Sequence, residues 1–345
     1  MLTGRRIRVL IVDDSALVRK LLADALTQEA DIEVVGSAPD AYVARDKIVA
    51  LSPDVLTLDI AMPRMDGITF LRMLMHFHSI PTVVVSSLVQ PSCRAAILAL
   101  EAGAVEILAK PDGPRALAQL RQTLPNLVRS AAVSRIQKYR YPDDQPASAA
   151  AGASLPSIVA IGASTGGIDA IGSVLKRLPK YSPGVLIVQH IPAGFSTAFA
   201  RRMNEMCRME VREAQDGDEV APGLALIAPG DYHMLLRRSG RNRQTVTVKA
   251  GPRISYQRPS VDVLFASVAE AAGANATGVL LTGMGADGAH GLLQMRQAGA
   301  HTIAQDEASS VVFGMPREAI RLGAAAQVLG LRAIPAAILS KSAPR

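Results

Sequence analysis

The segment IGASTGG (161–167) could hold either a phosphate or a reactive serine. It lies between an apolar run, SIVAI, and a stretch with helical periodicity. A dinucleotide-binding fingerprint needs a glycine in the place of Ser164, and a P-loop needs a lysine after its last glycine. Neither residue is present, and the next apolar run ends in LIVQH rather than in an acidic residue. These departures disfavour a cofactor-binding loop.

The second interpretation is a nucleophilic serine. GASTG matches the G-x-S-x-G pattern of a sharp strand-to-helix turn that exposes a serine hydroxyl, although so short a match also fits a simple helix N-cap. Such a serine needs a base. His190 directly follows the apolar run GVLIVQ, so parallel strands would bring Ser164 and His190 to one edge of a sheet. His290, at the start of a helical stretch, is the main competitor.

A histidine base needs a carboxylate on its other ring nitrogen. Asp287 supplies one in TGVLLTGMGADGAHG, after another buried run, although it could instead cap the helix that follows. The glycines of this segment leave backbone N–H groups free, so the amides of Met284 and of the turn near Thr165 are candidate oxyanion donors. The chain order Ser, His, Asp differs from that of the α/β-hydrolases. The pattern therefore predicts a separate arrangement of the same three groups for the same nucleophilic chemistry.

A second group of reactive side chains lies in the first 125 residues. Asp13 and Asp14 follow the first strand-like run, Asp59 follows the third, Ser86 ends the fourth, and Lys110 follows the fifth. In a doubly wound parallel sheet these positions meet at one edge. Clustered carboxylates suit Mg²⁺, and a lysine and a hydroxyl beside them suit a phosphoryl group. The pattern predicts phosphoryl transfer to a carboxylate oxygen.

The elements that must position these residues alternate along the chain. In the first half, strand-like runs cover 7–12, 33–36, 54–58, 81–87 and 105–109, and helical patterns cover 16–28, 40–50, 67–78, 92–102 and 114–129. This alternation predicts a five-stranded, doubly wound parallel sheet. Residues 130–156 become rich in Ala, Ser and Pro. We expect one domain at 5–125, a linker at 126–156 and a second domain at 157–342.

The second half alternates as well. Strand-like runs cover 157–162, 184–189, 224–228, 233–237, 245–249, 277–282 and 301–305, and helical patterns cover 167–178, 194–206, 260–272, 286–298 and 316–322. RRSGRNR is a polar turn between two β-rich runs. The second domain is therefore expected to be α/β, with a mainly parallel sheet and an antiparallel hairpin.

Composition narrows the function classes. The net charge of the 345 residues is +7, and residues 153–345 hold 20 Lys and Arg against 14 Asp and Glu, which could steer an acidic partner. Aromatic residues are scarce and interleave with no basic stripe, which disfavours nucleic-acid binding. Cys93 and Cys207 fit neither a disulfide framework nor a metal site, which indicates a reducing compartment. Without a signal peptide or a long apolar run, we expect a cytoplasmic protein with no membrane insertion.

Three segments of the first half, VLIVDDSALVRKLL, LTLDIAMPRMDGITFL and AKP, closely resemble a response-regulator receiver domain. The resemblance implies a phosphoacceptor, Asp59; Mg²⁺ ligands, Asp13, Asp14, Asp59 and the backbone carbonyl of Ala61; a switch hydroxyl, Ser86; and a phosphate-sensing cation, Lys110. One position departs from the family pattern. Ile107 stands where receivers usually carry Tyr or Phe, so a rotating aromatic ring cannot report phosphorylation there.

Six segments of the second half carry a family resemblance: the turns IGASTGG, VQHIPAGF and LTGMGADGAHG, and the stretches APGDYHMLL, RPSVDVLF and QDEASSVVFGMPREAI. Together they strongly resemble the catalytic domain of the chemotaxis protein-glutamate methylesterases, the CheB family. The resemblance implies Ser164 as nucleophile, His190 as general base and then acid, Asp287 as the residue that orients it, and Thr165 as part of the site. It implies no cofactor for the ester reaction. The family hydrolyses glutamate methyl esters on chemoreceptor helices, releasing methanol, and some members also deamidate receptor glutamines.

The same resemblance implies methyl-accepting chemotaxis receptors as substrates and a chemotaxis histidine kinase as phosphodonor; we expect a monomer. The fusion of a receiver to this domain leads to the hypothesis that the receiver covers the serine site until Asp59 is phosphorylated. Two alternatives keep the receiver but change its output: a non-catalytic receptor-binding or scaffold module, or a nucleotide-binding domain. A DNA-binding output has no helix-turn-helix signature to support it.

Overall fold

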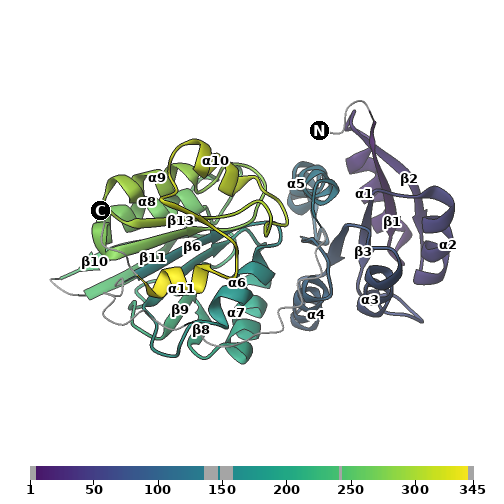
Figure 1. The fold of residues 1–345 in the computed structure, drawn as a ribbon. Helices are drawn as coiled ribbons and strands as arrows, with labels where there is room; N and C mark the ends of the chain where they lie inside the picture. The colour runs from purple at the N-terminus through teal and green to yellow at the C-terminus, as the bar shows by residue number, and fades with distance from the viewer. Residues whose placement is uncertain (1–4, 136–146, 148–157, 241–242, 341–345) are drawn as a thin grey trace. The chain divides into compact units, whose positions relative to one another are not determined.

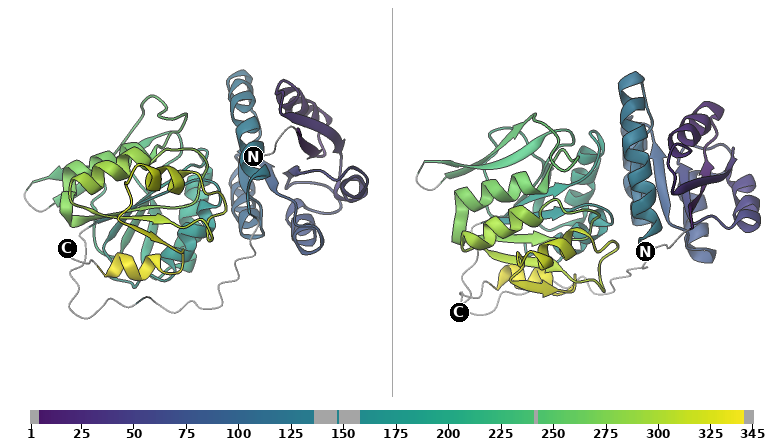
Figure 2. Two further views of the ribbon diagram at one scale, coloured as in Figure 1. Left: turned by 45° about the horizontal axis from the view of Figure 1, so that its top comes forward. Right: turned by 90° about the horizontal axis from the view of Figure 1, so that it is seen from above.

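The computed structural model describes residues 5–135, 147, 158–240 and 243–340. The chain divides into two compact units, residues 1–138 and 139–345. Each unit is built on its own parallel sheet, with helices on both faces (Figure 1, Figure 2). This agrees with the α/β class that the alternating pattern predicts for both halves.

The first unit contains a five-stranded parallel sheet in the order β2-β1-β3-β4-β5. Its strands are β1 (Ile7–Val12), β2 (Ile32–Ala38), β3 (Val55–Asp59), β4 (Thr82–Ser86) and β5 (Glu106–Ala109). All residues of β3 and β4 are buried, which explains why these strands appear as continuous apolar runs rather than as alternating patterns. The order places β1, β3 and β4 side by side, so their carboxyl ends share one edge.

Within the described residues of this unit, five helices cover the sheet: α1 (Ala16–Leu26), α2 (Ala41–Leu51), α3 (Gly67–Phe77), α4 (Gln90–Glu101) and α5 (Pro114–Ala132). The side chains of Ser15, Asp40 and Asp66 accept backbone N–H groups and begin α1, α2 and α3. The linker was predicted to start at residue 126, but helix α5 continues to Ala132. Val128 and Ala131, in this last part of the helix, are fully buried, and their packing stabilises it. Apart from residue 147, residues 136–157 of that linker lie outside the described residues.

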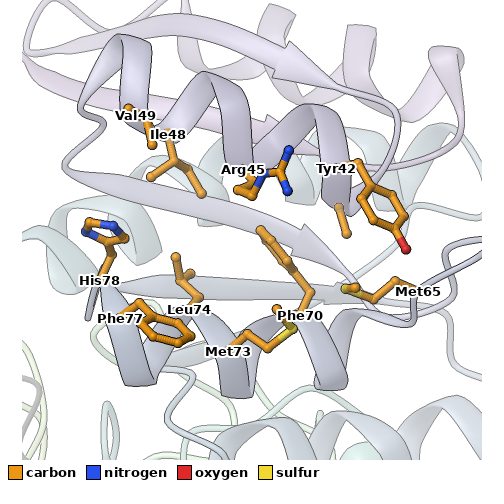
Figure 3. Close-up of a pocket in the computed structure, with 11 residues that line it drawn as sticks. Tyr42, Arg45, Ile48, Val49, Met65, Phe70, Met73, Leu74, Phe77 and His78 are labelled. Carbon is orange, nitrogen blue, oxygen red and sulfur yellow. The ribbon is translucent and has the colours of Figure 1, made fainter.

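A cavity of about 350 Å³ lies between α2 and α3 of the first unit. Figure 3 shows apolar side chains from both helices facing it, including Ile48 of α2 and Phe70 and Leu74 of α3. Val49 and Phe77 at its margin are each 71% exposed. None of the sequence-predicted site residues lines this cavity.

The second unit contains a seven-stranded parallel sheet in the order β14-β13-β12-β6-β7-β9-β8. The strands are β6 (Ile158–Ala163), β7 (Gly184–Gln189), β8 (Glu210–Glu213), β9 (Leu224–Ile227), β12 (Ala276–Leu280), β13 (His301–Gln305) and β14 (Gln327–Leu329). A separate antiparallel hairpin joins β10 (His233–Ser239) to β11 (Arg243–Lys249), as the polar turn between them predicts. Strand β6 is central, with β7 on one side and β12 on the other.

The helices of the second unit are α6 (Gly167–Leu175), α7 (Phe195–Met206), α8 (Val261–Ala272), α9 (Ala289–Gln297), α10 (Met315–Arg321) and α11 (Ile334–Leu339). Strands β8 and β14 and helix α11 were not predicted. Both strands lie at the edges of the sheet, where a strand needs no continuous apolar run. Among the described helices, none is long and apolar enough to cross a membrane.

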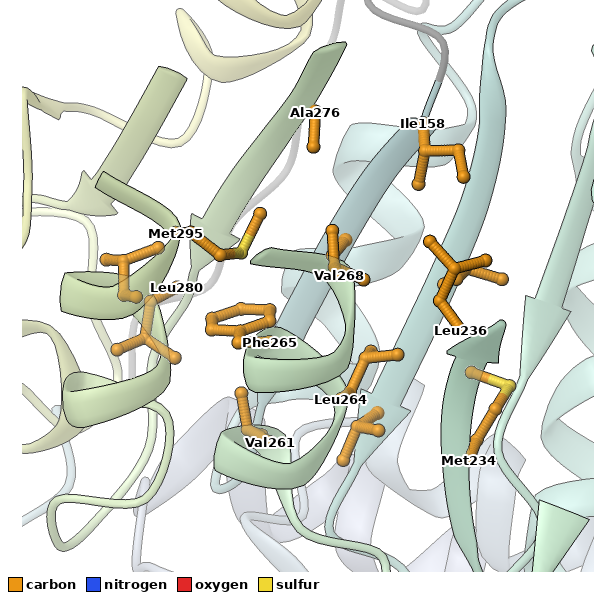
Figure 4. Packing of buried hydrophobic residues seen from close by; sticks show 14 of the residues in the cluster. Ile158, Met234, Leu236, Val261, Leu264, Phe265, Val268, Ala276, Leu280 and Met295 are labelled. Atoms are coloured by element: carbon orange, nitrogen blue, oxygen red, sulfur yellow. The ribbon is translucent and has the colours of Figure 1, made fainter. Parts of the chain in front are cut away.

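Helix α8 is anchored in a hydrophobic core of the second unit. Figure 4 shows its residues Val261, Leu264 and Phe265 among buried side chains from the hairpin strand β10 and the parallel sheet. All three are fully buried. Burial of each such side chain contributes about 2 kcal/mol, so the position of the α8 N-terminus is well fixed.

Candidate active site

Ser164 and His190 lie at the same edge of the central strands. Strands β6 and β7 are parallel with Ala163 opposite Gln189, and Ser164 and His190 are the next residues of the two strands. The N–H of His190 donates to the carbonyl of Ala163 at 3.1 Å, which holds the two strand ends together. The structure therefore brings together the serine and the histidine that the strand order predicts to be neighbours.

Asp287 reaches this edge from the other side of β6. It lies in the turn after β12, and its Oδ2 is 2.8 Å from Nε2 of His190. The turn is tied to the serine through a 3.0 Å hydrogen bond from the N–H of Ser164 to the carbonyl of Thr282. Three turns that follow the adjacent strands β7, β6 and β12 thus converge.

The carboxylate of Asp287 is also bound by the N-terminus of helix α8. It accepts hydrogen bonds from the N–H groups of Val261 at 2.8 Å and Asp262 at 3.1 Å, and from the hydroxyl of Ser260 at 2.8 Å. From the sequence, Asp287 could instead have capped the helix that follows it, but its carboxylate binds the start of α8. The tertiary contact makes this difference, because Ser260 precedes Asp287 by 27 residues.

The protonation state of this pair follows from the same contacts. Burial raises the pKa of Asp287, but the hydrogen bond and charge interaction with His190 and the bonds from α8 outweigh burial and lower its pKa below the usual value of 3.8. An ionised carboxylate only accepts hydrogen bonds, so Nε2 of His190 is the donor. Its Nδ1 is buried and has no hydrogen-bond partner among the described residues. This nitrogen is the ring atom available to accept a proton.

Gln189 lies in the site, although no role for it was predicted from the sequence. Its buried side chain donates from Nε2 to the carbonyl of Ser164 at 2.8 Å and to the carbonyl of His190 at 3.2 Å. A Cβ at Gly167 would lie 2.1 Å from its Oε1, so the glycine of the turn makes room for the amide. The signal was a polar residue ending the otherwise apolar run GVLIVQ.

Residues 283–285, the GMG turn, pack directly against Ser164. A Cβ at Gly283 would lie 2.7 Å from the Cβ of Ser164 and 2.3 Å from Sδ of Met315. The carbonyl of Gly283 accepts the N–H groups of Gly314 at 3.0 Å and Met315 at 2.8 Å. The segment QDEASSVVFGMPREAI therefore holds the turn in place through these two hydrogen bonds.

The two predicted oxyanion residues have different surroundings. Met284 is 41% exposed, and its backbone N–H donates to no acceptor within the described part of the chain. Thr165 is 2% exposed, and its carbonyl accepts the hydroxyl of Thr282 at 2.9 Å. The competing histidine, His290, lies exposed in the first turn of α9.

The acidic edge of the first unit forms a second site. Atoms of Asp13, Asp14 and Asp59 that could bind a metal lie within 4.8 Å of one another. Nζ of Lys110 is 2.9 Å from Oδ2 of both Asp13 and Asp59. Burial raises the pKa of Asp13. Burial alone would lower the pKa of Lys110, but the two carboxylates raise it. This all-oxygen cluster beside a cation fits a hard divalent metal ion.

The remaining predicted receiver residues surround this cluster. The carbonyl of Ser86 accepts the N–H of Lys110 at 2.8 Å, and the N–H of Ala61 donates to Oδ1 of Asp59 at 3.2 Å. Ile107 is buried on β5, opposite Val84 of β4. An aliphatic side chain at this position has no hydroxyl to exchange between two hydrogen-bond partners.

Comparison with known proteins identifies the family of each unit. The two units define a response regulator whose output domain is an α/β enzyme. The CheB methylesterase family model matches residues 159–338, and the response regulator receiver domain model matches residues 9–122. The chain belongs to the CheB methylesterase family, which confirms the assignment made from its motifs.

Relatives match over nearly the whole chain. A protein from Syntrophus aciditrophicus (strain SB) is 53% identical over 334 residues, which cover 95% of this chain and 97% of the relative. A protein from Salmonella typhimurium (strain LT2) is 51% identical over 340 residues, 97% of each chain. Both carry the name protein-glutamate methylesterase/protein-glutamine glutaminase.

One solved structure matches the second unit. The catalytic domain of the Thermotoga maritima CheB methylesterase has a TM-score of 0.52 and 36% sequence identity, and the match covers 54% of this chain and 98% of that domain. The expected fold, a receiver followed by a methylesterase domain with an antiparallel hairpin, is confirmed.

Proposed function

We propose that this chain is a phosphorylation-activated protein-glutamate methylesterase of a chemosensory pathway. It hydrolyses glutamate methyl esters on the cytoplasmic helices of methyl-accepting chemotaxis receptors and also deamidates receptor glutamines. The observation that carries the proposal is the His190–Asp287 pair beside Ser164 in a chain of the CheB methylesterase family. The names of its relatives support both activities.

The chemistry uses three side chains in sequence. Nδ1 of His190 accepts the proton of Ser164 as Oγ attacks the ester carbonyl. The tetrahedral intermediate collapses, and His190 returns the proton to the leaving methoxide, which departs as methanol. His190 then takes a proton from the water that attacks the glutamyl-enzyme and returns it to Oγ of Ser164 as the ester bond breaks, which releases the glutamate and regenerates Ser164. Deamidation follows the same course with ammonia as the leaving group.

Asp287 and the backbone donors assist this course electrostatically. The ionised carboxylate holds the proton of His190 on Nε2 and stabilises the imidazolium that forms. We assign the oxyanion to the amide of Met284 and to the turn at Thr165. In comparable sites one such donor contributes about 3–4 kcal/mol to the transition state.

The acidic edge of the receiver takes up the phosphoryl group. We propose Asp59 as its acceptor from a chemotaxis histidine kinase, with Asp13, Asp14, Asp59 and the carbonyl of Ala61 holding Mg²⁺. A bound Mg²⁺ would offset the charge of both reacting groups. Lys110, which already pairs with Asp13 and Asp59, would then pair with the phosphoryl oxygens, and the hydroxyl of Ser86 would bond to them.

The receiver is proposed to restrict access to Ser164 until Asp59 is phosphorylated. Phosphorylation adds about two negative charges, enough to shift a balance of a few kcal/mol between covered and open enzyme. A chain that begins near Ser157 should then hydrolyse esters faster than the unphosphorylated full chain. Equal rates for the two would remove this hypothesis and leave the esterase proposal intact.

The excess of Lys and Arg over Asp and Glu in residues 153–345 favours binding to acidic receptor helices. We propose that the protein works in the cytoplasm as a monomer, without nucleic-acid partners. The direct test is mass analysis of receptor peptides before and after incubation with the phosphorylated chain. Loss of methyl groups from glutamates and conversion of glutamines support the proposal. Unchanged peptides would favour a scaffold or receptor-binding module.

A further inference from the structure

His233 is a buried histidine with no part in the three-residue chemistry above. It is the first residue of β10 and is 4% exposed. Its Nδ1 is 3.3 Å from the backbone N of Ser260, and its Nε2 is 2.8 Å from the carbonyl oxygen of Pro252. A backbone N–H only donates and a carbonyl only accepts. The two bonds therefore select the neutral ring with its proton on Nε2.

Ser260, the partner of His233, also holds the carboxylate of Asp287. The hydroxyl of Ser260 donates to Oδ1 of Asp287 at 2.8 Å, and the next residue, Val261, donates its N–H to Oδ2 at 2.8 Å. Oδ2 is the oxygen that also accepts Nε2 of His190. A continuous series of hydrogen bonds therefore connects His233 to Ser260, Ser260 to Asp287, and Asp287 to His190.

We propose that His233 is a positioning residue for ester hydrolysis. By accepting the backbone N–H of Ser260, it fixes the direction in which the Ser260 hydroxyl points and thus the orientation of the Asp287 carboxylate beside His190. This inference rests on the proposed function, because it assigns His233 a role only if His190 acts as the base. His233 contacts none of the reacting atoms and acts through Ser260.

The hairpin that carries His233 is attached to α8 at a second point. The N–H of Leu236 donates to the hydroxyl of Ser267 at 2.9 Å. Leu236 and its neighbour Met234 belong to the same buried cluster as Leu264 and Val268 of α8 (Figure 4). Loss of the second attachment should weaken the packing of the hairpin on α8 and leave the bonds to Asp287 in place. Ser267 therefore provides a matched control for His233.

Two substitutions of His233 separate its two ring nitrogens. In His233→Asn, the side-chain oxygen takes the place of Nδ1 and can accept the N–H of Ser260. In His233→Gln, the amide nitrogen reaches the place of Nε2 and can donate to Pro252, but no acceptor remains for Ser260. Both variants and Ser267→Ala would be made in the full chain. Methanol release from methylated receptor fragments and the melting temperature would be measured for each.

We expect His233→Asn to keep kcat within about twofold and His233→Gln to lower kcat about 3- to 10-fold with little change in KM, the size expected for one lost neutral hydrogen bond. Ser267→Ala should lower the melting temperature and retain kcat. Equal kcat for His233→Asn and His233→Gln, or an equal loss of kcat in Ser267→Ala, would overturn the inference.

A second measurement needs no variant and holds even if His233→Gln does not fold. The ¹⁵N NMR spectrum of the full chain should show His233 with its proton on Nε2; a proton on Nδ1 would overturn the inference, since that atom could not accept the N–H of Ser260. The underlying proposed function fails separately. If Ser164→Ala retains normal turnover, Ser164 is not the nucleophile and His190 does not act as its base, so the proposed function fails. If Ser164→Ala is inactive but His233→Asn and His233→Gln have equal kcat, only the positioning role of His233 is rejected.

Discussion

Asp287 accepts Nε2 of His190 at 2.8 Å and, through the same oxygen, the N–H of Val261 at 2.8 Å. One carboxylate therefore orients the catalytic histidine and binds the N-terminus of helix α8. The positive end of the helix dipole favours the ionised form of such a carboxylate. The orientation of the base thus depends on the position of the α8 N-terminus.

The first prediction concerns Asp287→Asn. In this variant an amide NH₂ replaces one acceptor oxygen of the carboxylate and faces groups that are themselves donors, such as Nε2 of His190 or the N–H of Val261. Both the tautomer of His190 and the start of α8 should therefore be disturbed. We expect kcat to fall about 10³- to 10⁴-fold, as for an equivalent change in a comparable triad. Stability should fall by about 1–3 kcal/mol because a buried donor loses its partner. Methanol release and urea unfolding measure the two effects.

Asp216→Asn is a suitable control for this change. Asp216 is exposed and accepts the backbone N–H of Val248 at 2.9 Å, so it is another carboxylate bonded to backbone, with no bond to His190. It should retain normal kcat. Normal turnover in Asp287→Asn would contradict the role given to this residue.

A second prediction concerns acid stability. The folded-state pKa of Asp287 lies below 3.8, so its ionised form stabilises the folded protein at neutral pH. This contribution is fully present above the unfolded-state pKa of about 3.9 and is lost as pH falls through the lower folded pKa. The difference in unfolding free energy between the natural chain and Asp287→Asn should therefore shrink below about pH 4. A difference that stays constant from pH 7 to pH 3 would argue against an ionised Asp287.

A third prediction concerns Gly283→Ala. The new methyl group would meet the Cβ of Ser164 and Sδ of Met315 at distances that no folded protein tolerates without movement. We expect a loss of about 1–3 kcal/mol in stability and a clear fall in kcat as Ser164 is displaced. In Gly172→Ala, by contrast, the methyl lies 3.5 Å from the Met203 sulfur, an ordinary contact, and activity should be normal. Equal activity of the two variants would contradict the tight packing of the GMG turn.

Much of the site could be predicted because strand order governs it. Ser164 and His190 follow buried apolar runs, and parallel pairing of β6 with β7 then makes them neighbours. The same logic places Asp59 beside Asp13, since β1 and β3 are adjacent. These positions need only the alternation of strands and helices and the rule that parallel strands end together.

The roles of Ser260 and His233 could not be predicted in this way. Ser260 contacts Asp287 because α8 packs with the hairpin in one core, a tertiary arrangement that leaves no periodic signal in the sequence. His233 was expected at a strand start, which is where it lies, but its partner depends on that same packing. The edge strands β8 and β14 were missed because they are short and only partly buried.

A fourth prediction concerns the metal at the receiver edge. Mg²⁺ should raise the melting temperature of the receiver unit, because an ion that binds only the folded state stabilises it. Asp13→Asn should abolish the increase, and Asp24→Asn, on the exposed face of α1, should keep it. The pKa of Asp13 is raised above 3.8. The affinity for Mg²⁺ should therefore decline as pH falls toward that pKa, because the ligand must be ionised. An unchanged Mg²⁺ effect in Asp13→Asn would exclude Asp13 as a ligand.

The most direct test of the proposed esterase chemistry is turnover by the phosphorylated full chain carrying Ser164→Ala. We expect methanol release from methylated receptors to fall about 10⁶-fold, as in a comparable Ser-His-Asp site, while circular dichroism and melting temperature stay close to those of the natural chain. We also expect a transient glutamyl ester on Ser164 of the natural chain, detectable by mass spectrometry after acid quenching. A folded Ser164→Ala chain that releases methanol within about threefold of the natural rate would show that Ser164 is not the nucleophile.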